Sequence, residues 1–206
     1  MENGVKIVAS ALKRSGAIRF GNFKLKSGVM SPYYIDLTWL LSSPNEFESV
    51  VNTVSEEAKI ISASRHINKM ASIELKGALL LPSIANRLKM PSIVVRKESK
   101  SYGLKGRIVG GEILRDDKIL FFDDVVTDGR SKKEGIEPLE ASGAVIKDIL
   151  VVIDRQQGGK RNLNEMGYEL SSIATISEIV KSLVSTEELH EGEAERILDY
   201  VGNMPF

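Results

Sequence analysis

The fold is decided by residues 119–131, which read Ile119-Leu120-Phe121-Phe122-Asp123-Asp124-Val125-Val126-Thr127-Asp128-Gly129-Arg130-Ser131. The first four residues are apolar and lack the polar alternation of a half-exposed strand. This pattern predicts a strand covered on both faces, as in a parallel sheet. Asp123 and Asp124 therefore stand at the carboxyl end of a buried strand, which is the edge where open α/β sheets bind ligands.

The second half of this stretch predicts an anion site. Residues 127–131 form a short turn with a glycine and two hydroxyls, followed by a predicted helix over residues 132–141. Backbone N–H groups at a helix start lack internal partners and carry partial positive charge, so a phosphate satisfies both. Taken alone, the stretch is explained equally well by an ordinary strand, turn and helix with capping side chains. If a phosphate binds, we expect the Asp128 carboxylate to point away from it.

Composition excludes several classes of protein. The charges of the 28 basic and 28 acidic side chains cancel, which argues against a protein that binds nucleic acid through its overall electrostatic field. The absence of cysteine excludes a disulfide framework, a thiol nucleophile and a cysteine metal site. No apolar run approaches the ~20 residues of a membrane span, and no secretory leader is recognisable. We expect a cytoplasmic protein with neither a membrane nor a nucleic-acid partner.

Apolar periodicity along the chain indicates one α/β domain over residues 1–206. A helix over residues 5–14 is followed by short β-like pieces up to residue 37, separated by glycines and a proline. From residue 68 onward, short apolar runs alternate with helical segments, which implies right-handed crossovers. The prediction is a mostly parallel central sheet flanked by helices, with a core over about residues 41–175. A small N-terminal hood takes about residues 1–40 and part of the C-terminal segment.

Four other segments carry side chains suited to anionic or flat ligands. Residues 25–34 combine a lysine, two serines, a glycine and two tyrosines, which suit a flat heterocycle bearing a carboxylate. Residues 96–106 are basic and punctuated by glycine, which predicts a mobile loop over a pyrophosphate. Lys76-Gly77 stands at the start of a predicted helix, where the backbone could contact a second anion. Arg155 follows a buried strand, and its guanidinium group could bind a carboxylate through two hydrogen bonds. A hairpin, a solvated loop, a helix entry and a surface Asp-Arg pair are the plainer explanations.

Four segments together resemble the orotate branch of the type I phosphoribosyltransferases. Residues 119–131 resemble the family signature of an apolar strand, two acidic residues and a phosphate loop. Residues 20–34, with Phe-Gly-Asn-Phe-Lys-Leu-Lys-Ser-Gly and Ser-Pro-Tyr-Tyr, resemble the N-terminal signature of orotate phosphoribosyltransferases. The Arg-Lys-Glu-Ser-Lys-Ser-Tyr-Gly loop and the Asp-Arg-Gln-Gln-Gly-Gly turn resemble two further motifs. Tyr102 stands where many members have histidine, and Leu75 stands where an aromatic residue is usual.

The resemblance implies transfer of the phosphoribosyl group of phosphoribosyl pyrophosphate to orotate, giving orotidine 5′-monophosphate with Mg²⁺ as cofactor. It assigns catalysis to Lys100 and Asp124. The implied contacts of phosphoribosyl pyrophosphate are Lys76, Arg96, Lys97, Lys100, Tyr102, Asp123, Asp124, Val125, Val126, Thr127, Asp128, Gly129, Arg130 and Ser131. The implied contacts of orotate are Lys26, Tyr34, Thr127 and Arg155. No metal ligand is assigned, because Mg²⁺ would be bound mainly through the cosubstrate. A homodimer is implied, with the loop over residues 97–109 reaching the neighbouring site.

Two alternative functions stay open from the residues alone. A phosphoribosyltransferase for another nucleobase would keep residues 119–131 but would not need Lys26 and Arg155 together for a carboxylate. A non-enzymatic regulator that senses phosphoribosyl pyrophosphate would keep the same fold, because a fold does not fix a function. Such a regulator would more naturally carry a DNA-binding segment or a basic face.

Overall fold

Strand β6 (Ile119–Val126) lies in the middle of a six-stranded sheet with the order β5-β4-β3-β6-β7-β8. The computed structural model describes residues 2–24, 28–100 and 106–203, without the side chain of Lys100. All neighbouring strands of this sheet run parallel except β4 and β5. The predicted α/β fold with a mostly parallel sheet is confirmed.

The strands of the large sheet are β3 (Lys69–Ile73), β4 (Ser92–Lys100), β5 (Gly106–Val109), β6, β7 (Asp148–Asp154) and β8 (Glu169–Thr175). The helices flank this sheet or belong to the hood. The helices are α1 (Glu2–Arg14), the 3-10 helix η1 (Leu37–Ser42), α2 (Pro44–Arg65), α3 (Lys76–Leu88), α4 (Arg130–Ala141), α5 (Gly159–Glu165), α6 (Ile176–Ser185) and α7 (Glu191–Gly202). No helix within the described ranges has the length and apolar character needed to cross a bilayer.

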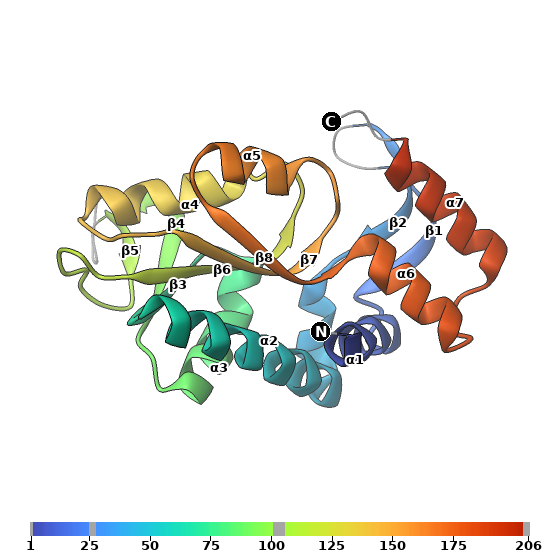
Figure 1. Cartoon of the computed structure of the whole chain (residues 1–206), viewed down its shortest axis with the longest axis horizontal. Coiled ribbons are helices and arrows are strands. Elements are labelled where there is room, and N and C mark those ends of the chain that lie inside the picture. Colours follow the sequence, from blue (N-terminus) through green and yellow to red (C-terminus); the bar gives the residue numbers. More distant parts are fainter. Residues whose placement is uncertain (1, 25–27, 101–105, 204–206) are drawn as a thin grey trace.

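Helices cover both faces of the sheet, with α2 and α3 on one side and α4 and α5 on the other (Figure 1). Successive residues of β6 therefore serve different cores, because side chains alternate across a strand. Leu120 and Phe122 belong to the core on the side of α2 and α3. Ile119 and Phe121 belong to the core on the side of α4. All four are fully buried, as the uninterrupted apolar run predicted.

The N-terminal hood contains a separate antiparallel pair, β1 (Ile18–Lys24) and β2 (Met30–Ile35). Figure 1 shows this pair beside α7 at one end of the molecule, away from the strands β3 to β5. The ring of Tyr33 on β2 meets Tyr200 of α7 edge-on, with 6.0 Å between the ring centres. The C-terminal helix thus packs on the N-terminal hairpin. The exact limits of hood and core remain a prediction.

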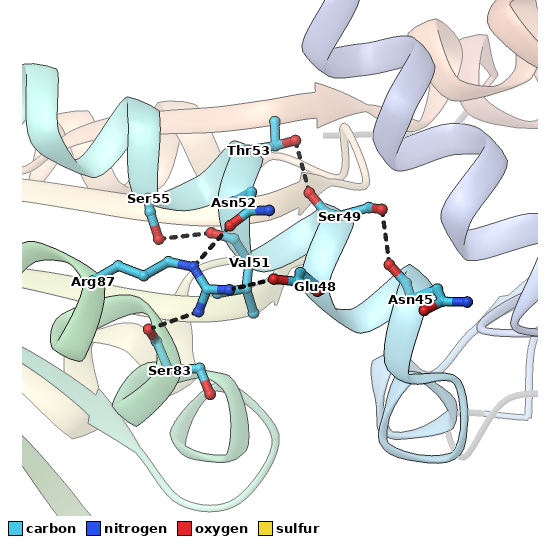
Figure 2. A network of polar contacts seen from close by, with 9 residues as sticks. All are labelled: Asn45, Glu48, Ser49, Val51, Asn52, Thr53, Ser55, Ser83 and Arg87. Carbon is cyan, nitrogen blue, oxygen red and sulfur yellow. Dashed lines mark hydrogen bonds and ion pairs between the residues drawn. The ribbon is translucent and has the colours of Figure 1, made fainter.

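Helices α2 and α3 are joined by the guanidinium group of Arg87 (Figure 2). Its Nε donates to the side-chain oxygen of Asn52 at 2.7 Å, and a terminal nitrogen lies 3.2 Å from Glu48 Oε1. The other terminal nitrogen donates to the carbonyl of Ser83 within α3. These contacts hold the C-terminal half of α3 against α2. The first turn of α3 lies at the other end of the helix, at the sheet edge.

The loop predicted over residues 96–106 is wrong at both ends. Strand β4 continues to Lys100, and β5 begins at Gly106. The two strands pair antiparallel, with Val95 opposite Ile108 and Lys100 opposite Gly106. Backbone hydrogen bonding to an edge strand thus overrides the basic, glycine-punctuated composition that favoured a loop. Residues 101–105, between the strands, lie outside the described part of the chain.

Helix α4 sits close to the sheet because Gly135 has no side chain. A Cβ atom built on Gly135 would lie 2.6 Å from the ring of Phe121 and 3.0 Å from Ile73 Cβ. Both neighbours are buried and packed in the core. The position of α4, and with it the turn that precedes this helix, depends on this contact.

We predict that Gly135→Ala lowers the free energy of unfolding by about 1–2 kcal/mol. Overpacking of a core costs about 1–3 kcal/mol, and the better helix propensity of alanine returns up to about 1 kcal/mol. Gly192→Ala in α7 is the matched control, because a Cβ there meets nothing within 4 Å. Urea denaturation measures both variants. A Gly135→Ala protein as stable as the control variant would contradict the packing argument.

Candidate active site

Two acidic side chains lie at the point where the sheet reverses its order. Strands β3 and β6 are neighbours, and the chain leaves β3 toward β4 and leaves β6 toward β7, on opposite sides. The first turns of α3 and α4 consequently lie beside each other at the carboxyl edge. Such a switch point is where open α/β sheets bind ligands. Asp123 and Asp124 stand at this edge and are 5% and 7% exposed.

Asp123 is paired with a buried lysine of α4. The Nζ atom of Lys132 lies 2.6 Å from Asp123 Oδ2, and the two side chains are 4% and 8% exposed. The same ammonium group donates to the carbonyl of Val125 and to Ser131 Oγ at 3.3 Å. The remaining oxygen, Oδ1 of Asp123, accepts the backbone N–H of Asp124 at 3.0 Å.

Asp124 has no ion-pair partner among the described residues. Burial and the neighbouring charge of Asp123 raise the pKa of Asp124 to about 7, although Lys132 and Lys76 act in the opposite direction. The ammonium of Lys76 lies 3.0 Å from Asp36 Oδ1, just before η1. Burial works against ionisation of Asp36, but the hydrogen bonds from Lys76 and Thr38 outweigh it and lower its pKa. Lys76 therefore lies between a hood carboxylate and the acidic pair.

The predicted phosphate turn forms the start of α4. Gly129 caps the helix with φ of 88°, a conformation that favours glycine. The backbone N–H groups of Gly129 and Ser131 have no partner among the described residues, so they are available to an anion. Arg130 is exposed and pairs with Asp128.

Asp128 accepts hydrogen bonds from Arg130 at the start of α4, and its orientation relative to a bound phosphate stays a prediction. Its Oδ1 accepts the backbone N–H of Arg130 at 3.0 Å, and Oδ2 contacts the Arg130 side chain. Burial opposes ionisation, but these hydrogen bonds outweigh it and lower the pKa of Asp128. An Asp two residues before a helix N–H commonly makes this local bond. The carboxylate thus takes one of the donors that the turn would offer a phosphate.

Helix α5 packs against the turn between β6 and α4. Asn162 donates through Nδ2 to the carbonyl of Asp128 at 3.0 Å. A Cβ built on Gly159 would lie 2.6 Å from Val126 and 2.7 Å from the carbonyl oxygen of Thr127. Thr127 itself is exposed, Val126 is buried, and Val125 is half-buried and offers its carbonyl to Lys132. The turn between β6 and α4 is therefore held by packing as well as by its own hydrogen bonds.

Strand β4 brings cationic residues to the same edge of the sheet. The backbone N–H of Lys97 donates to Glu74 Oε1 at 2.8 Å, and the carbonyl of Arg96 accepts from Arg107 of β5 at 2.7 Å. Arg96 is half-buried and Lys97 is exposed. Lys100 ends β4, but its side chain is not described. Lys26 and Tyr102 lie outside the described residues.

The hood meets the core through Arg155, directly after β7. The guanidinium carbon of Arg155 lies 5.1 Å from the ring centre of Tyr33, and its Nε is 3.4 Å from the Tyr33 hydroxyl. Burial raises the pKa of Tyr33 in spite of the charge of Arg155. Tyr34, the predicted contact, is half-buried and lies against Phe23, with 5.7 Å between ring centres. Neighbouring residues of a strand point to opposite faces, so Tyr33 takes the place beside Arg155.

Two residues of this arrangement were missed from the sequence. Lys132 heads a buried helical stripe that continues through Gly135, Ile136 and Leu139. A lysine in line with such a stripe is the signal that could have identified it, because a buried lysine requires a partner. Tyr33 could have been found from the alternation along β2, in which Ser31 and Tyr33 are buried.

Comparison with known proteins identifies the family. No family model matches the chain. Orotate phosphoribosyltransferase from Methanosarcina acetivorans is 33% identical over 172 residues, covering 84% of this chain and 89% of that protein. The enzyme of the same name from Thermoplasma volcanium is 36% identical over 173 residues, covering 84% of this chain and 99% of that protein.

The fold agrees with a solved structure of the same name. The crystal structure of orotate phosphoribosyltransferase from Aeropyrum pernix superimposes with a TM-score of 0.75 and 31% identity, covering 86% of this chain and 98% of that one. Sequence similarity and fold thus indicate the same family. The acidic pair and the predicted phosphate turn lie where the strand order of the sheet reverses. The chain belongs to the orotate phosphoribosyltransferase family.

Proposed function

We propose that this protein transfers the phosphoribosyl group of phosphoribosyl pyrophosphate to orotate, giving orotidine 5′-monophosphate and pyrophosphate in pyrimidine biosynthesis. The observation that carries this proposal is the acidic pair beside an open phosphate turn at the switch point of the sheet. Family membership supports the choice of orotate as the base. In the reaction, a ring nitrogen of orotate bonds to C1 of the ribose while the bond from C1 to pyrophosphate breaks, and the proton of that nitrogen is released.

The sugar and its 5′-phosphate are assigned to the acidic pair and to the turn at the start of α4. The free N–H groups of Gly129 and Ser131 suit the 5′-phosphate, and the exposed hydroxyl of Thr127 lies beside them. The acidic pair at the end of β6 suits the ribose hydroxyls. Fixing the sugar at both places aligns C1 with the incoming nitrogen, which lowers the entropic part of the barrier.

The leaving pyrophosphate is assigned to cations from α3 and β4. Lys76 stands beside the acidic pair, and Arg96, Lys97 and Lys100 follow one another along β4. Cations placed where negative charge develops stabilise the transition state more than the ground state. Among the described residues, no group of three or more His, Cys, Asp or Glu side chains is placed to hold a metal. A Mg²⁺ ion held mainly by oxygens of the cosubstrate would supply charge neutralisation there.

The base is assigned to the place where the hood meets the end of β7. Arg155 offers a guanidinium group beside Tyr33, and its fork suits the carboxylate of orotate. Lys26, Tyr34 and Thr127 remain predicted contacts of orotate, and Tyr102 remains a predicted contact of phosphoribosyl pyrophosphate. We further propose a homodimer in the cytoplasm, with the loop over residues 97–109 of one subunit reaching the site of the other. Trp39, Leu41 and Leu75 expose 47%, 50% and 62% of their surfaces, which supports a partner surface near η1 and α3.

The proposed function is tested by following orotate spectrophotometrically with phosphoribosyl pyrophosphate and Mg²⁺ present. We expect orotate to be consumed, and we expect no reaction when uracil, hypoxanthine or adenine replaces it, because these bases lack the carboxylate. Consumption of one of these bases instead would assign a different phosphoribosyltransferase. No reaction with any base would favour a regulator.

Asp124→Asn is predicted to weaken the binding of phosphoribosyl pyrophosphate about tenfold or more at pH 8, since a hydrogen bond to a charged group is worth about 1.5–3 kcal/mol. The same change is predicted to raise the stability of the protein at pH 8. The folded wild-type protein binds a proton on Asp124 up to pH of about 7. The unfolded chain releases that proton near pH 4, so wild-type stability falls as pH rises between these values.

Calorimetric titration and thermal unfolding at pH 5.5 and pH 8 check both parts. The affinity loss and the stability gain of Asp124→Asn should each be larger at pH 8, where the wild-type carboxyl is ionised. Equal affinities of variant and wild type at pH 8 would remove Asp124 from the sugar site.

Lys100→Ala is predicted to lower turnover by about 100-fold while changing the affinity for orotidine 5′-monophosphate much less, because the charge that it meets develops during the reaction. Lys181→Ala, at an exposed position of α6, is the control. Mixing the Lys100→Ala and Asp124→Asn proteins should restore part of the activity if the loop acts across a dimer. Equal losses of turnover and product affinity would refute the role of Lys100, and no recovery on mixing would refute action across subunits.

A further inference from the structure

Gln156 follows Arg155 directly after β7 and has a backbone conformation that residues other than glycine rarely adopt. Its φ angle is 55°, in the left-handed region, where a side chain with a Cβ atom costs free energy. The backbone N–H of Arg155 still donates to the carbonyl of Val126 at 3.1 Å, so the chain follows β6 up to this residue. The chain therefore turns away from the sheet at Gln156, next to the residue proposed to meet the base.

The backbone and the side chain of Gln156 both make hydrogen bonds that hold this turn. The backbone N–H donates to Asp154 Oδ1 at 2.8 Å, and the side-chain Oε1 accepts the backbone N–H of Ser177 at 3.1 Å. Ser177 is the second residue of α6, where an N–H group has no partner inside the helix. Thr175 caps the N–H of Glu178 in the same turn. Gln156 thus supplies an oxygen that the capping residue does not.

Asp154 bonds to Gln156 and forms no ion pair with its neighbour Arg155. Burial raises the pKa of Asp154, although the N–H of Gln156 and the charge of Lys160 act against this. Within the described ranges, Arg155 has no carboxylate partner, and its Nε lies 3.4 Å from the Tyr33 hydroxyl. That distance is longer than the usual limit of about 3.2 Å, so the bond is weak. The guanidinium group keeps donors for a ligand, but its own contacts hold its direction poorly.

We infer that Gln156 is a positioning residue, which directs Arg155 toward Tyr33 and thereby sets how tightly the protein binds the carboxylate of the base. This inference rests on the proposed function and deepens it. A guanidinium group forms two parallel hydrogen bonds to a carboxylate only in one orientation, so its support affects affinity. The oxygen of Gln156 provides this support by tying the turn after β7 to α6.

The two sides of the proposed base site are attached to one pair of helices. Gln156 links Arg155 to α6, and Tyr33 packs on Tyr200 of α7. Helices α6 and α7 pack against each other beside the hood hairpin (Figure 1). The guanidinium group and the ring are thus held to a common support, although they come from segments far apart in the sequence. Removing the Gln156 oxygen would release one side and leave the other in place.

The inference is tested with variants that differ in one oxygen. Gln156→Met keeps the length of the side chain and the same backbone strain but loses the acceptor. Gln156→Glu keeps an acceptor, and a negative charge is favourable at the start of α6. Gln157→Met is the matched control, because this half-buried neighbour makes no side-chain hydrogen bond among the described residues. Gln156→Gly adopts a positive φ freely and serves as a second variant if Gln156→Met does not fold.

Calorimetric titration with two nucleotides supplies a readout that a purely structural role would not move. Uridine 5′-monophosphate is orotidine 5′-monophosphate with hydrogen in place of the carboxylate. We expect Gln156→Met to lower the affinity for orotidine 5′-monophosphate about tenfold and to leave that for uridine 5′-monophosphate within about twofold. Gln156→Glu and Gln157→Met should stay within about threefold of wild type for both. The KM for orotate should rise in Gln156→Met while the KM for phosphoribosyl pyrophosphate stays unchanged.

Arg155→Ala separates a failure of this inference from a failure of the proposed function. It should remove the preference for the nucleotide that carries the carboxylate. If it does, a folded Gln156→Met or Gln156→Gly protein with the wild-type preference refutes the inference alone. Equal losses of affinity for both nucleotides would also refute it, because Gln156 would then not act through the carboxylate.

The behaviour of the wild-type protein decides the rest. If Arg155→Ala keeps the preference, Arg155 does not bind the carboxylate, and the inference falls with that contact. If wild type prefers the nucleotide with the carboxylate but consumes no orotate, the proposed reaction is wrong while the role of Gln156 is still decided by the titrations. If wild type binds neither nucleotide, the proposed function and the inference are both overturned.

Discussion

Two adjacent carboxylates must be buried at the end of β6, and the surrounding structure supplies what this burial requires. Removing one partner of a buried ion pair typically costs about 3–5 kcal/mol, so Asp123 and Lys132 depend on each other. Lys132 reaches Asp123 only because α4 lies close to the sheet, which requires Gly135. Gly77 allows α3 an equally close approach from the other side. The spacing of both helices from the sheet is thus coupled to the placement of one charge.

Local patterns predicted the parts of the protein that are set by periodicity. The apolar run before Asp123, the turn with Gly129 and the alternation of strands with helices gave the sheet and the edge where ligands bind. The pairing of β4 with β5 was missed because its partner strand lies beyond a basic, glycine-rich segment, and only a sheet edge makes that segment extended. The hydrogen bond from the Arg130 N–H to Asp128 was also missed, although an Asp at this spacing commonly makes it.

From the residues alone, without the family resemblance, contacts between distant segments could not be predicted. Arg155 faces Tyr33 because the hood folds over the end of β7, and no spacing in the sequence encodes that approach. Tyr33 in turn packs on Tyr200, so the first hairpin, the strand end and the last helix meet at one aromatic ring. The residues proposed for the base therefore depend on the C-terminal helix, although that helix contributes none of them.

The position of β6 between β3 and β7 also determines which parts of the site can move. Backbone amides in a central strand exchange with solvent only when neighbouring strands separate, so β6 belongs to the last part of the protein to open. The hood hairpin and the antiparallel arm of β4 and β5 have fewer neighbours and open at lower free energy. In the proposed function, the sugar would therefore be held on the segment that opens last, and the parts proposed to admit the base and release pyrophosphate would be the ones that adjust.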